Sequence, residues 1–348
     1  AVSDAMPLSD HDAEVYGRMN EALVETASGA DAGAPWKGAP AAEDDVSVEG
    51  WLRREGMSES GVHAVGTLVS SCGSTVPLDR MSFYSYAIKV ATRGGPGKGN
   101  EYRVEGGAGK VAEALAAELG DRVRLFSPVT DVLQDEDGVE VRWMTGNGPR
   151  SARSRRVILA LPFTCYRDLR FDPLPPPAVR RMIPRSVYGV VRKTFFVFDE
   201  EVDASAFTVT DTALGYCSAA QASEGAGGIV SFAGGEPLLP ELGRQAAERK
   251  ERSLRLLRGL YELPEPVAVV EKVWPDEYWT RGSYMIMAPG DMSLFGAEMG
   301  GSFGGVHLAG AEGYAAAPSF MNSAVKAGLR AGRETAEALE AGMARARG

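Results

Sequence analysis

The sequence predicts an α/β fold, more closely α+β, in which two domains are interleaved along one chain. Three observations support this prediction. The run 156–162 is apolar on both faces, as a strand within a parallel sheet requires. The segment 306–331 reads as a short strand followed by a helix rich in small residues. Between these segments the pattern changes to short β-rich runs, so a second domain with its own sheet is expected.

The composition argues against several classes of protein. The chain has 348 residues, of which 44% are hydrophobic and 24% charged, as expected for one large or two intertwined globular domains. Its 42 glycines and 20 prolines follow no period, so a fibrous protein is excluded. The sequence contains no run of eighteen apolar residues, so no membrane span is predicted. The formal net charge of −10 argues against a nucleic-acid partner. Three scattered cysteines and three histidines predict no metal site and favour a reducing, cytoplasmic compartment.

The first hundred residues are predicted to be mainly helical. Residues 10–27 have one apolar stripe, formed by Val15, Met19, Leu23 and Val24. A linker of small residues follows at 29–42, and 46–88 predicts further helices. Two serines are placed to cap these helices, Ser47 and Ser58. The glycine-rich run 92–99 is predicted to be a connector, because no apolar strand precedes it and no helix follows directly.

The remaining elements alternate between the two predicted domains. A helix is expected at 110–119, after a glycine-rich turn. Strand-like runs follow at 123–125, 129–133 and 139–143, the last two joined by a turn at 135–138. Residues 173–288 predict mainly strands, with one helix at 242–260. The chain therefore divides into four pieces, with 101–163 and 303–348 in one domain and 1–100 and 164–302 in the other.

Several motifs occur together in an order known from one protein family. They are Ala34-Pro35-Trp36-Lys37, Glu105-Gly106-Gly107-Ala108-Gly109, Pro128-Val129-Thr130, the run Tyr188 to Lys193, and Trp274 followed by Arg281-Gly282-Ser283-Tyr284 and Pro289-Gly290. The last is a strand that reaches Gly310, with Glu312 two residues later and a small-residue helix after Pro318. Over nearly the whole chain, this series resembles the flavin-dependent amine oxidases, the monoamine oxidase and L-amino-acid oxidase family.

The resemblance implies a fold and a cofactor. The pieces 101–163 and 303–348 would form a Rossmann-like FAD-binding domain, incomplete in this chain. The pieces 1–100, which is helical, and 164–302, a mixed sheet plus helix, would form the substrate domain. FAD is expected to be non-covalent, because Ser283 stands where some relatives have a cysteine joined to the flavin.

Three catalytic residues follow from the same resemblance. Lys193 would lie near flavin N5, and Tyr284 and Phe320 would form the aromatic cage that guides a neutral amine. Independently, Lys193 lies within a β-rich run at 190–198, where a charge is expected to face a cavity. The alternative for Lys193 is an exposed lysine on a half-buried strand, and for Tyr284 and Phe320 it is ordinary core packing.

Further residues are implied as contacts of the cofactor and substrate. The cofactor contacts are Val129, Gly106, Gly107, Gly310, Glu312 and Met321. The alternative for Glu312 is a helix-capping acid. Cys72 and Trp279 are candidate walls of the substrate cavity, with core packing as the alternative for both and a position at the cavity rim as a further alternative for Trp279.

One departure from the family pattern is large. The family begins with about 100 residues of strand, G-x-G-x-x-G and helix, whose glycines bring a helix N-terminus to the pyrophosphate, and this sequence lacks that unit. Without it, the strand at 155–161 and the strand ending at Ala309 are expected to have unpaired edges and exposed apolar faces. We therefore predict that a second polypeptide supplies the unit. The alternatives are a chain trimmed at its N-terminus and a flavin-free homologue kept for binding.

The implied reaction is the oxidation of an amine or amino acid. A hydride equivalent moves from the carbon next to nitrogen to flavin N5, and the product is an imine. Fold alone does not fix the substrate. A large cavity without an aromatic cage would instead favour oxidation or desaturation of a natural-product intermediate, and a colourless protein would favour a scaffold.

Overall fold

The computed structural model describes residues 6–31, 33–38, 44–71, 75–92, 104–203, 207–220, 227–314 and 319–345. Helices fill the N-terminal part, as predicted. They are α1 (Asp10–Ser28), α3 (Val48–Arg54), α4 (Glu59–Val69) and α5 (Phe83–Thr92), with the short turns η1 (Pro35–Lys37) and η3 (Leu78–Arg80). The side chains of Ser47 and Ser58 accept backbone N–H groups of Gly50 and Gly61, which confirms both predicted caps. Of the predicted connector at 92–99, Thr92 is the last residue of α5, and the rest lies outside the described residues.

Gly17 lies in the interior of α1 with open space beside it. A Cβ added there would meet no atom within 4 Å. Because alanine favours a helix over glycine by about 1 kcal/mol, we expect Gly17→Ala to raise the free energy of unfolding by about that amount. Urea denaturation measures the change. Gly50→Ala in α3 is the control, since its Cβ would lie 3.1 Å from the Oγ of Ser47, and an equal gain there would contradict the explanation.

The first sheet has the strand order β3-β2-β1-β5. Its strands are β1 (Val129–Asp135), β2 (Gly138–Thr145), β3 (Gly148–Ser154) and β5 (Arg170–Asp172). The predicted turn at 135–138 is confirmed, because Asp135 pairs with Gly138 across the hairpin. The predicted strand at 123–125 is wrong. That segment follows the turn η4 (Gly120–Arg122) and pairs with no strand within the described ranges.

A smaller sheet joins β4 (Val157–Leu159) to β14 (Val306–Leu308) in parallel, with β13 (Ser302–Phe303) on the far edge of β14. The expectation that the strand ending at Ala309 lacks a partner is therefore wrong, and all three residues of β14 are buried. The expected exposed apolar face of the strand at 155–161 is confirmed at Ile158, which is 40% exposed. Within the described ranges, the outer edge of β4 has no partner strand.

The second large sheet has the order β11-β7-β10-β9-β8 and is antiparallel throughout. Its strands are β7 (Val191–Val197), β8 (Thr208–Val209), β9 (Tyr216–Ala219), β10 (Gly228–Gly234) and β11 (Ala268–Val273). One face packs on α9 (Ala246–Arg258) through Phe196, Phe198 and Leu257. The sequence predicted a single helix in this region, but α7 (Pro177–Arg185) and α8 (Leu239–Leu242) are also present. The proline Pro177 reads as a breaker but is well suited to the first turn of α7.

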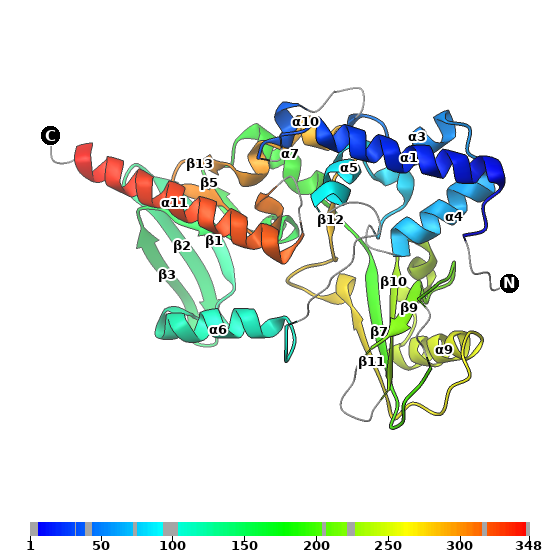
Figure 1. Cartoon of the computed structure of the whole chain (residues 1–348). Coiled ribbons are helices and arrows are strands. Elements are labelled where there is room, and N and C mark those ends of the chain that lie inside the picture. Colours follow the sequence, from blue (N-terminus) through cyan, green and yellow to red (C-terminus); the bar gives the residue numbers. More distant parts are fainter. Residues whose placement is uncertain are drawn as a thin grey trace.

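Two helices border the first sheet, α6 (Gly109–Leu119) and α11 (Met321–Arg345). Figure 1 shows them well apart, with β1, β2 and β3 between them, and it places the second large sheet at the other end of the molecule. No residue of α6 is buried in the described structure. None of the helices in the described ranges combines the length and the apolar character needed to span a bilayer.

Candidate functional site

Backbone hydrogen bonds join three distant segments at the start of β7. The N–H of Gly189 donates to the carbonyl of Tyr284 at 2.8 Å, and the N–H of Ser283 donates to the carbonyl of Gly189 at 2.9 Å. The N–H of Val190 donates to the carbonyl of Thr75 at 3.1 Å. The segment carrying Tyr284 is therefore fixed beside the strand that carries Lys193.

This junction needs residues without a side chain. A Cβ at Gly189 would lie 1.6 Å from the Oγ1 of Thr75 and 2.7 Å from its Cβ. A Cβ at Gly282 would lie 2.5 Å from the Cβ of Tyr188. These separations are far below van der Waals contact, so the two glycines permit an approach of backbones that any other residue would prevent.

A row of aromatic rings connects the second large sheet to Tyr284. The rings of Tyr216 and Phe232 stack across β9 and β10 with centroids 5.1 Å apart, and Phe232 lies 6.5 Å from Tyr284 with nearly parallel planes. Lys193 pairs with Phe232 across β7 and β10, and its ammonium lies 5.2 Å from the centre of that ring. Two of the predicted catalytic residues thus share one neighbour, Phe232.

Phe320 reaches the same region from the start of α11. Ser319 adopts a left-handed backbone with φ of 78°, and its hydroxyl accepts the N–H of Met285 at 2.6 Å. The Nζ of Lys89 lies 5.4 Å from the centre of the Tyr284 ring and 5.8 Å from that of Phe320. The structure therefore brings Lys193, Tyr284 and Phe320, which are far apart in sequence, into one cluster.

Lys89 was not identified from the sequence. It lies in the last turn of α5, where a lysine is usually explained by the helix dipole and by exposure to solvent. In the structure it is only 7% exposed. Phe232 was not identified either, because an aromatic residue in a strand is usually interpreted as part of the hydrophobic core.

Glu312 lies just beyond the carboxyl end of β14, after Gly310, whose φ is 86°. It is 6% exposed, and burial raises the pKa of its carboxyl group. Tyr188 lies close enough to this carboxyl group to offset part of the rise in its pKa, and the hydroxyl of Tyr188 accepts the N–H of Phe163 at 3.0 Å. Because Tyr188 also pairs with Met285, Glu312 is connected to the cluster around Tyr284.

The raised pKa of Glu312 has a consequence for stability. Above the ordinary value of 4.5 the unfolded chain releases a proton that the folded protein retains, so the free energy of unfolding falls as the pH rises through the folded pKa. Glu312→Gln removes this group. We therefore expect its stability relative to the parent protein to increase from pH 4.5 to pH 8, as measured by urea denaturation. The control is Glu251→Gln on the exposed face of α9, whose difference in stability from the parent protein should stay constant over this pH range. A constant difference for Glu312→Gln as well would contradict the explanation.

The other predicted cofactor residues lie around the first sheet and α11. Gly106 and Gly107 both have positive φ, 73° and 93°, and form the turn before α6. Val129 is the first residue of β1 and pairs with Trp143. Met321 begins α11 and is 54% exposed.

The two candidate walls of the substrate cavity differ from the cluster. Trp279 is 58% exposed, and its ring contacts Tyr278 edge-on at 4.6 Å. The alternative of core packing for Trp279 is therefore wrong. Its exposure fits a position at the rim of the candidate substrate cavity. Cys72 lies outside the described residues.

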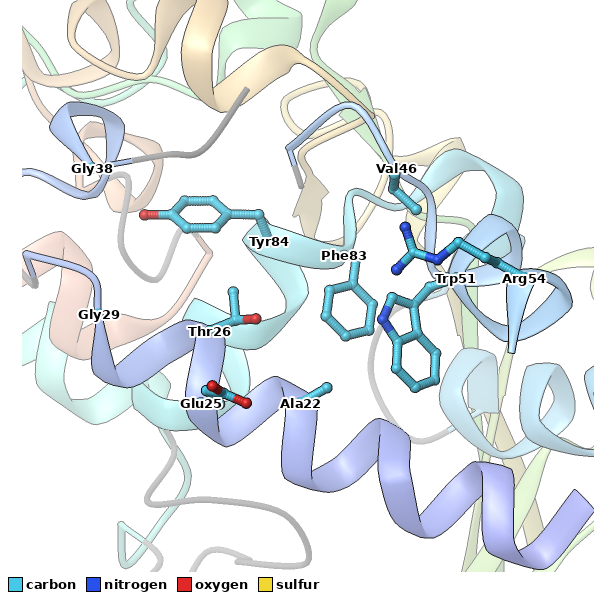
Figure 2. A pocket seen from close by; sticks show the side chains of 10 residues that line it. All are labelled: Ala22, Glu25, Thr26, Gly29, Gly38, Val46, Trp51, Arg54, Phe83 and Tyr84. Carbon is cyan, nitrogen blue, oxygen red and sulfur yellow. The ribbon is translucent and has the colours of Figure 1, made fainter. Parts of the chain in front are cut away.

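Two cavities lie on opposite faces of α5. One of about 380 Å³, shown in Figure 2, lies between α1, α3 and α5, with Phe83 and Tyr84 in its wall and Glu25 and Arg54 among its lining residues. The other, of about 20 Å³, has Ser85, Tyr86 and Lys89 in its wall. At about 100° per helical residue these two sets point in opposite directions. The larger cavity is thus separated by α5 from the cluster of Lys89, Tyr284 and Phe320.

Known proteins resemble this chain in sequence and in fold. The "L-amino acid dehydrogenase" of Synechocystis sp. is 29% identical over 240 residues, 66% of this chain and 50% of the relative. A flavin-containing amine oxidase of Danio rerio is 30% identical over 68% of this chain and 47% of the relative. Flavin-containing amine oxidase B of Homo sapiens is 28% identical over 88% of this chain and 62% of the relative. The chain thus spans about half to just under two thirds of the length of these relatives.

Solved structures show the same fold. Putrescine oxidase bound to putrescine has a TM-score of 0.83 at 24% identity, over 98% of this chain and 78% of that one. Cyclohexylamine oxidase from Brevibacterium oxydans also has a TM-score of 0.83 at 24% identity, over 97% and 77%. The family description "flavin containing amine oxidoreductase" matches residues 37–335. The chain therefore belongs to the flavin containing amine oxidoreductase family.

Proposed function

We propose that this chain is the larger part of an FAD-dependent oxidase of an amine or amino acid. The observation that carries the proposal is the cluster at the start of β7. Lys193 and Tyr284 both contact Phe232, and Tyr284 and Phe320 both contact Lys89. A scaffold protein has no need to assemble two lysines and a row of rings in this way.

The cluster suits the orientation of an amine. Bound FAD supplies the hydride acceptor, so the protein must hold the substrate and keep water organised around it. The rings of Tyr284 and Phe320 would form walls whose electron-rich faces attract the electropositive side of an amine. The Nζ of Lys193 would donate a hydrogen bond to a water molecule at the reacting centre.

The residues at the carboxyl ends of β4 and β14 fit FAD. Ligands of parallel α/β sheets bind beyond the carboxyl ends of the strands, where Gly310 and Glu312 lie. A buried carboxyl group suits the hydroxyl groups of a ribityl or ribose unit. The first N–H groups of α11, beginning at Met321, suit an electron-rich carbonyl of the flavin.

The remaining predicted residues would contact the other end of the cofactor. Gly106 and Gly107 leave room for a close approach of the backbone, and the backbone of Val129 would meet the adenine. The Ser283 hydroxyl donates to the carbonyl of Gly189 at 3.1 Å, and a hydroxyl forms no thioether. The FAD is therefore proposed to be non-covalent.

We also propose the interleaved domain division 1–100 and 164–302 against 101–163 and 303–348, with one change. Because β5 pairs with β1 in the first sheet, we place the second boundary after Asp172 rather than after 163.

A strand–G-x-G-x-x-G–helix unit of about 100 residues, carried by another polypeptide, is proposed to complete the FAD site. Two helices expose apolar stripes with i, i+4, i+8 spacing. In α6 the stripe residues are 39%, 58% and 47% exposed, at Val111, Leu115 and Leu119. In α11 they are 54%, 57% and 64% exposed, at Met321, Val325 and Leu329. Exposed stripes of this kind favour a protein–protein contact.

The test is an absorbance spectrum, with intact mass, of the protein purified from its native source. Yellow flavin bands together with a second polypeptide of about 100 residues would support both parts of the proposal. A colourless, folded, monodisperse single chain would overturn both parts and make a scaffold the leading alternative. Flavin bound by one longer polypeptide that contains this chain would overturn the second polypeptide alone.

The apolar stripes provide a second test. Val325→Lys is expected to abolish copurification of the second polypeptide, because it places a charge within the α11 stripe. Val267→Lys is the matched control, since Val267 is 60% exposed near the second large sheet. If the second polypeptide copurifies equally with both variants, the apolar stripe on α11 is not the surface that binds it.

A further inference from the structure

Lys89 places a positive charge against the two rings that the proposed function assigns as cage walls. Its Nζ lies 5.4 Å and 5.8 Å from the centres of Tyr284 and Phe320. The residue is 7% exposed, and burial of an ammonium group costs free energy that its surroundings must offset. The faces of two aromatic rings offset part of this cost, because they attract a cation.

A second polar group points to the same place. Ser85 lies one helical turn before Lys89 on α5, so both side chains are on one face of the helix. Its hydroxyl is buried and has no hydrogen-bond partner among the described residues. Both residues line the cavity of about 20 Å³, with Met285, Ile286 and Met287 as apolar walls. That volume holds about one water or one ligand oxygen.

We propose that Lys89 and Ser85 bind the carboxylate of an amino-acid substrate and so decide between amino acids and simple amines. This inference rests on the proposed function, because it takes Tyr284 and Phe320 as the walls of the substrate path. An ammonium and a hydroxyl in an apolar cavity are suited to hold a carboxylate oxygen. The same charge repels a second ammonium, so a diamine would be disfavoured by repulsion as well as by a missing contact.

The first test measures binding without turnover. Calorimetry on the flavin-loaded protein compares phenylacetate with phenylacetamide, which has nearly the same shape and no charge. We expect phenylacetate to bind about 10- to 100-fold more tightly, as hydrogen bonds to a charged group usually provide. Lys89→Met should remove this preference and Lys89→Arg should keep most of it. Ser85→Ala should reduce the preference only a few-fold, since a hydroxyl contributes less than a charge.

The control variant is Lys326→Met. The Nζ of Lys326 also lies over a ring, 4.9 Å from the centre of Tyr314, but it does not line this cavity. It should keep the parent preference for phenylacetate. If the parent protein binds phenylacetate no more tightly than phenylacetamide, the inference is overturned, and this result does not require any variant to fold.

The second test compares substrates that differ only by a carboxylate, namely L-ornithine with putrescine and L-phenylalanine with phenethylamine. We expect kcat/KM to favour the amino acid in the parent protein and to fall about 10- to 100-fold for it in Lys89→Met. Equal losses for both members of a pair would overturn the inference. A carboxylate preference that depends on Lys89, in a protein that oxidises neither series, would uphold the carboxylate site and overturn the oxidase proposal.

Discussion

Gly189→Ala is expected to destabilise the protein by about 3 kcal/mol, at the upper end of the cost of overpacking a well-packed site. The added Cβ would lie 1.6 Å from the Oγ1 of Thr75. Rotation of the Thr75 side chain cannot relieve the clash, because the Cβ and the carbonyl oxygen of Thr75 are only 2.7 and 3.1 Å away. Urea denaturation measures the loss. The aromatic row should be disturbed in the same variant, since Gly189 bonds to the backbone of Tyr284.

Gly243→Ala is the matched control for this prediction. A Cβ there would meet nothing within 4 Å, and the residue has ordinary helical φ and ψ, so a change within about 0.5 kcal/mol is expected. The double variant Gly189→Ala, Thr75→Gly should recover part of the loss, because Thr75 itself has a positive φ that glycine tolerates. A lack of recovery would show that the contact with Thr75 is not the cause.

Lys193→Met is expected to slow oxygen consumption by about 100-fold or more, the effect of removing a positioned acid–base group. Methionine keeps the length of the side chain, so the packing against Phe232 is retained while the charge is lost. Oxygen uptake at saturating substrate measures the change. The affinity for substrate should change much less, because Lys193 is proposed to act on a water and not on the substrate itself.

Lys272→Met is the control for this prediction. Lys272 is the cross-strand neighbour of Lys193 on β11, and its Nζ lies over the ring of Trp274 at 5.6 Å. A loss of no more than a few-fold is expected, because the side chain is half exposed and paired with Glu277. Comparable losses in both variants would indicate a general effect of positive charge on this face.

The local elements were largely predictable because their signals are local. Serine caps and an apolar stripe define α1, α3 and α4, and an acidic turn with a glycine defines the hairpin of β1 and β2. The helix α7 was missed because Pro177 and Pro184 both indicate a break. Pro177 lies in the first turn, where a helix tolerates proline, whereas Pro184 lies inside the last turn, where it removes one backbone hydrogen bond. The strand expected at 123–125 is absent because a strand requires a paired neighbour in space, and an apolar run alone does not specify one.

The site was only partly predictable, for the same physical reason. The motif around Lys193 marked a charge in a β-rich run, and the structure places it beside Phe232 and near Tyr284. Lys89 gave no comparable signal, because its burial is caused by Tyr284 and Phe320, which are about 200 residues away in sequence. The missing unit predicted that the outer edge of β4 would be unpaired. It did not predict that β14 would pair with the two-residue strand β13.

The strand β7 carries two cations in succession that point to opposite faces of its sheet. Arg192 is fully buried on the face that packs on α9 and donates to Ser253, whereas Lys193 lies with the aromatic row. A slip of one residue would exchange them, because strand side chains alternate. Pairing with β10 over seven residues and with β11 over six prevents such a slip. Homologues should therefore have no insertions or deletions between Gly189 and Lys193, so alignment gaps are expected in the loops beyond the sheet.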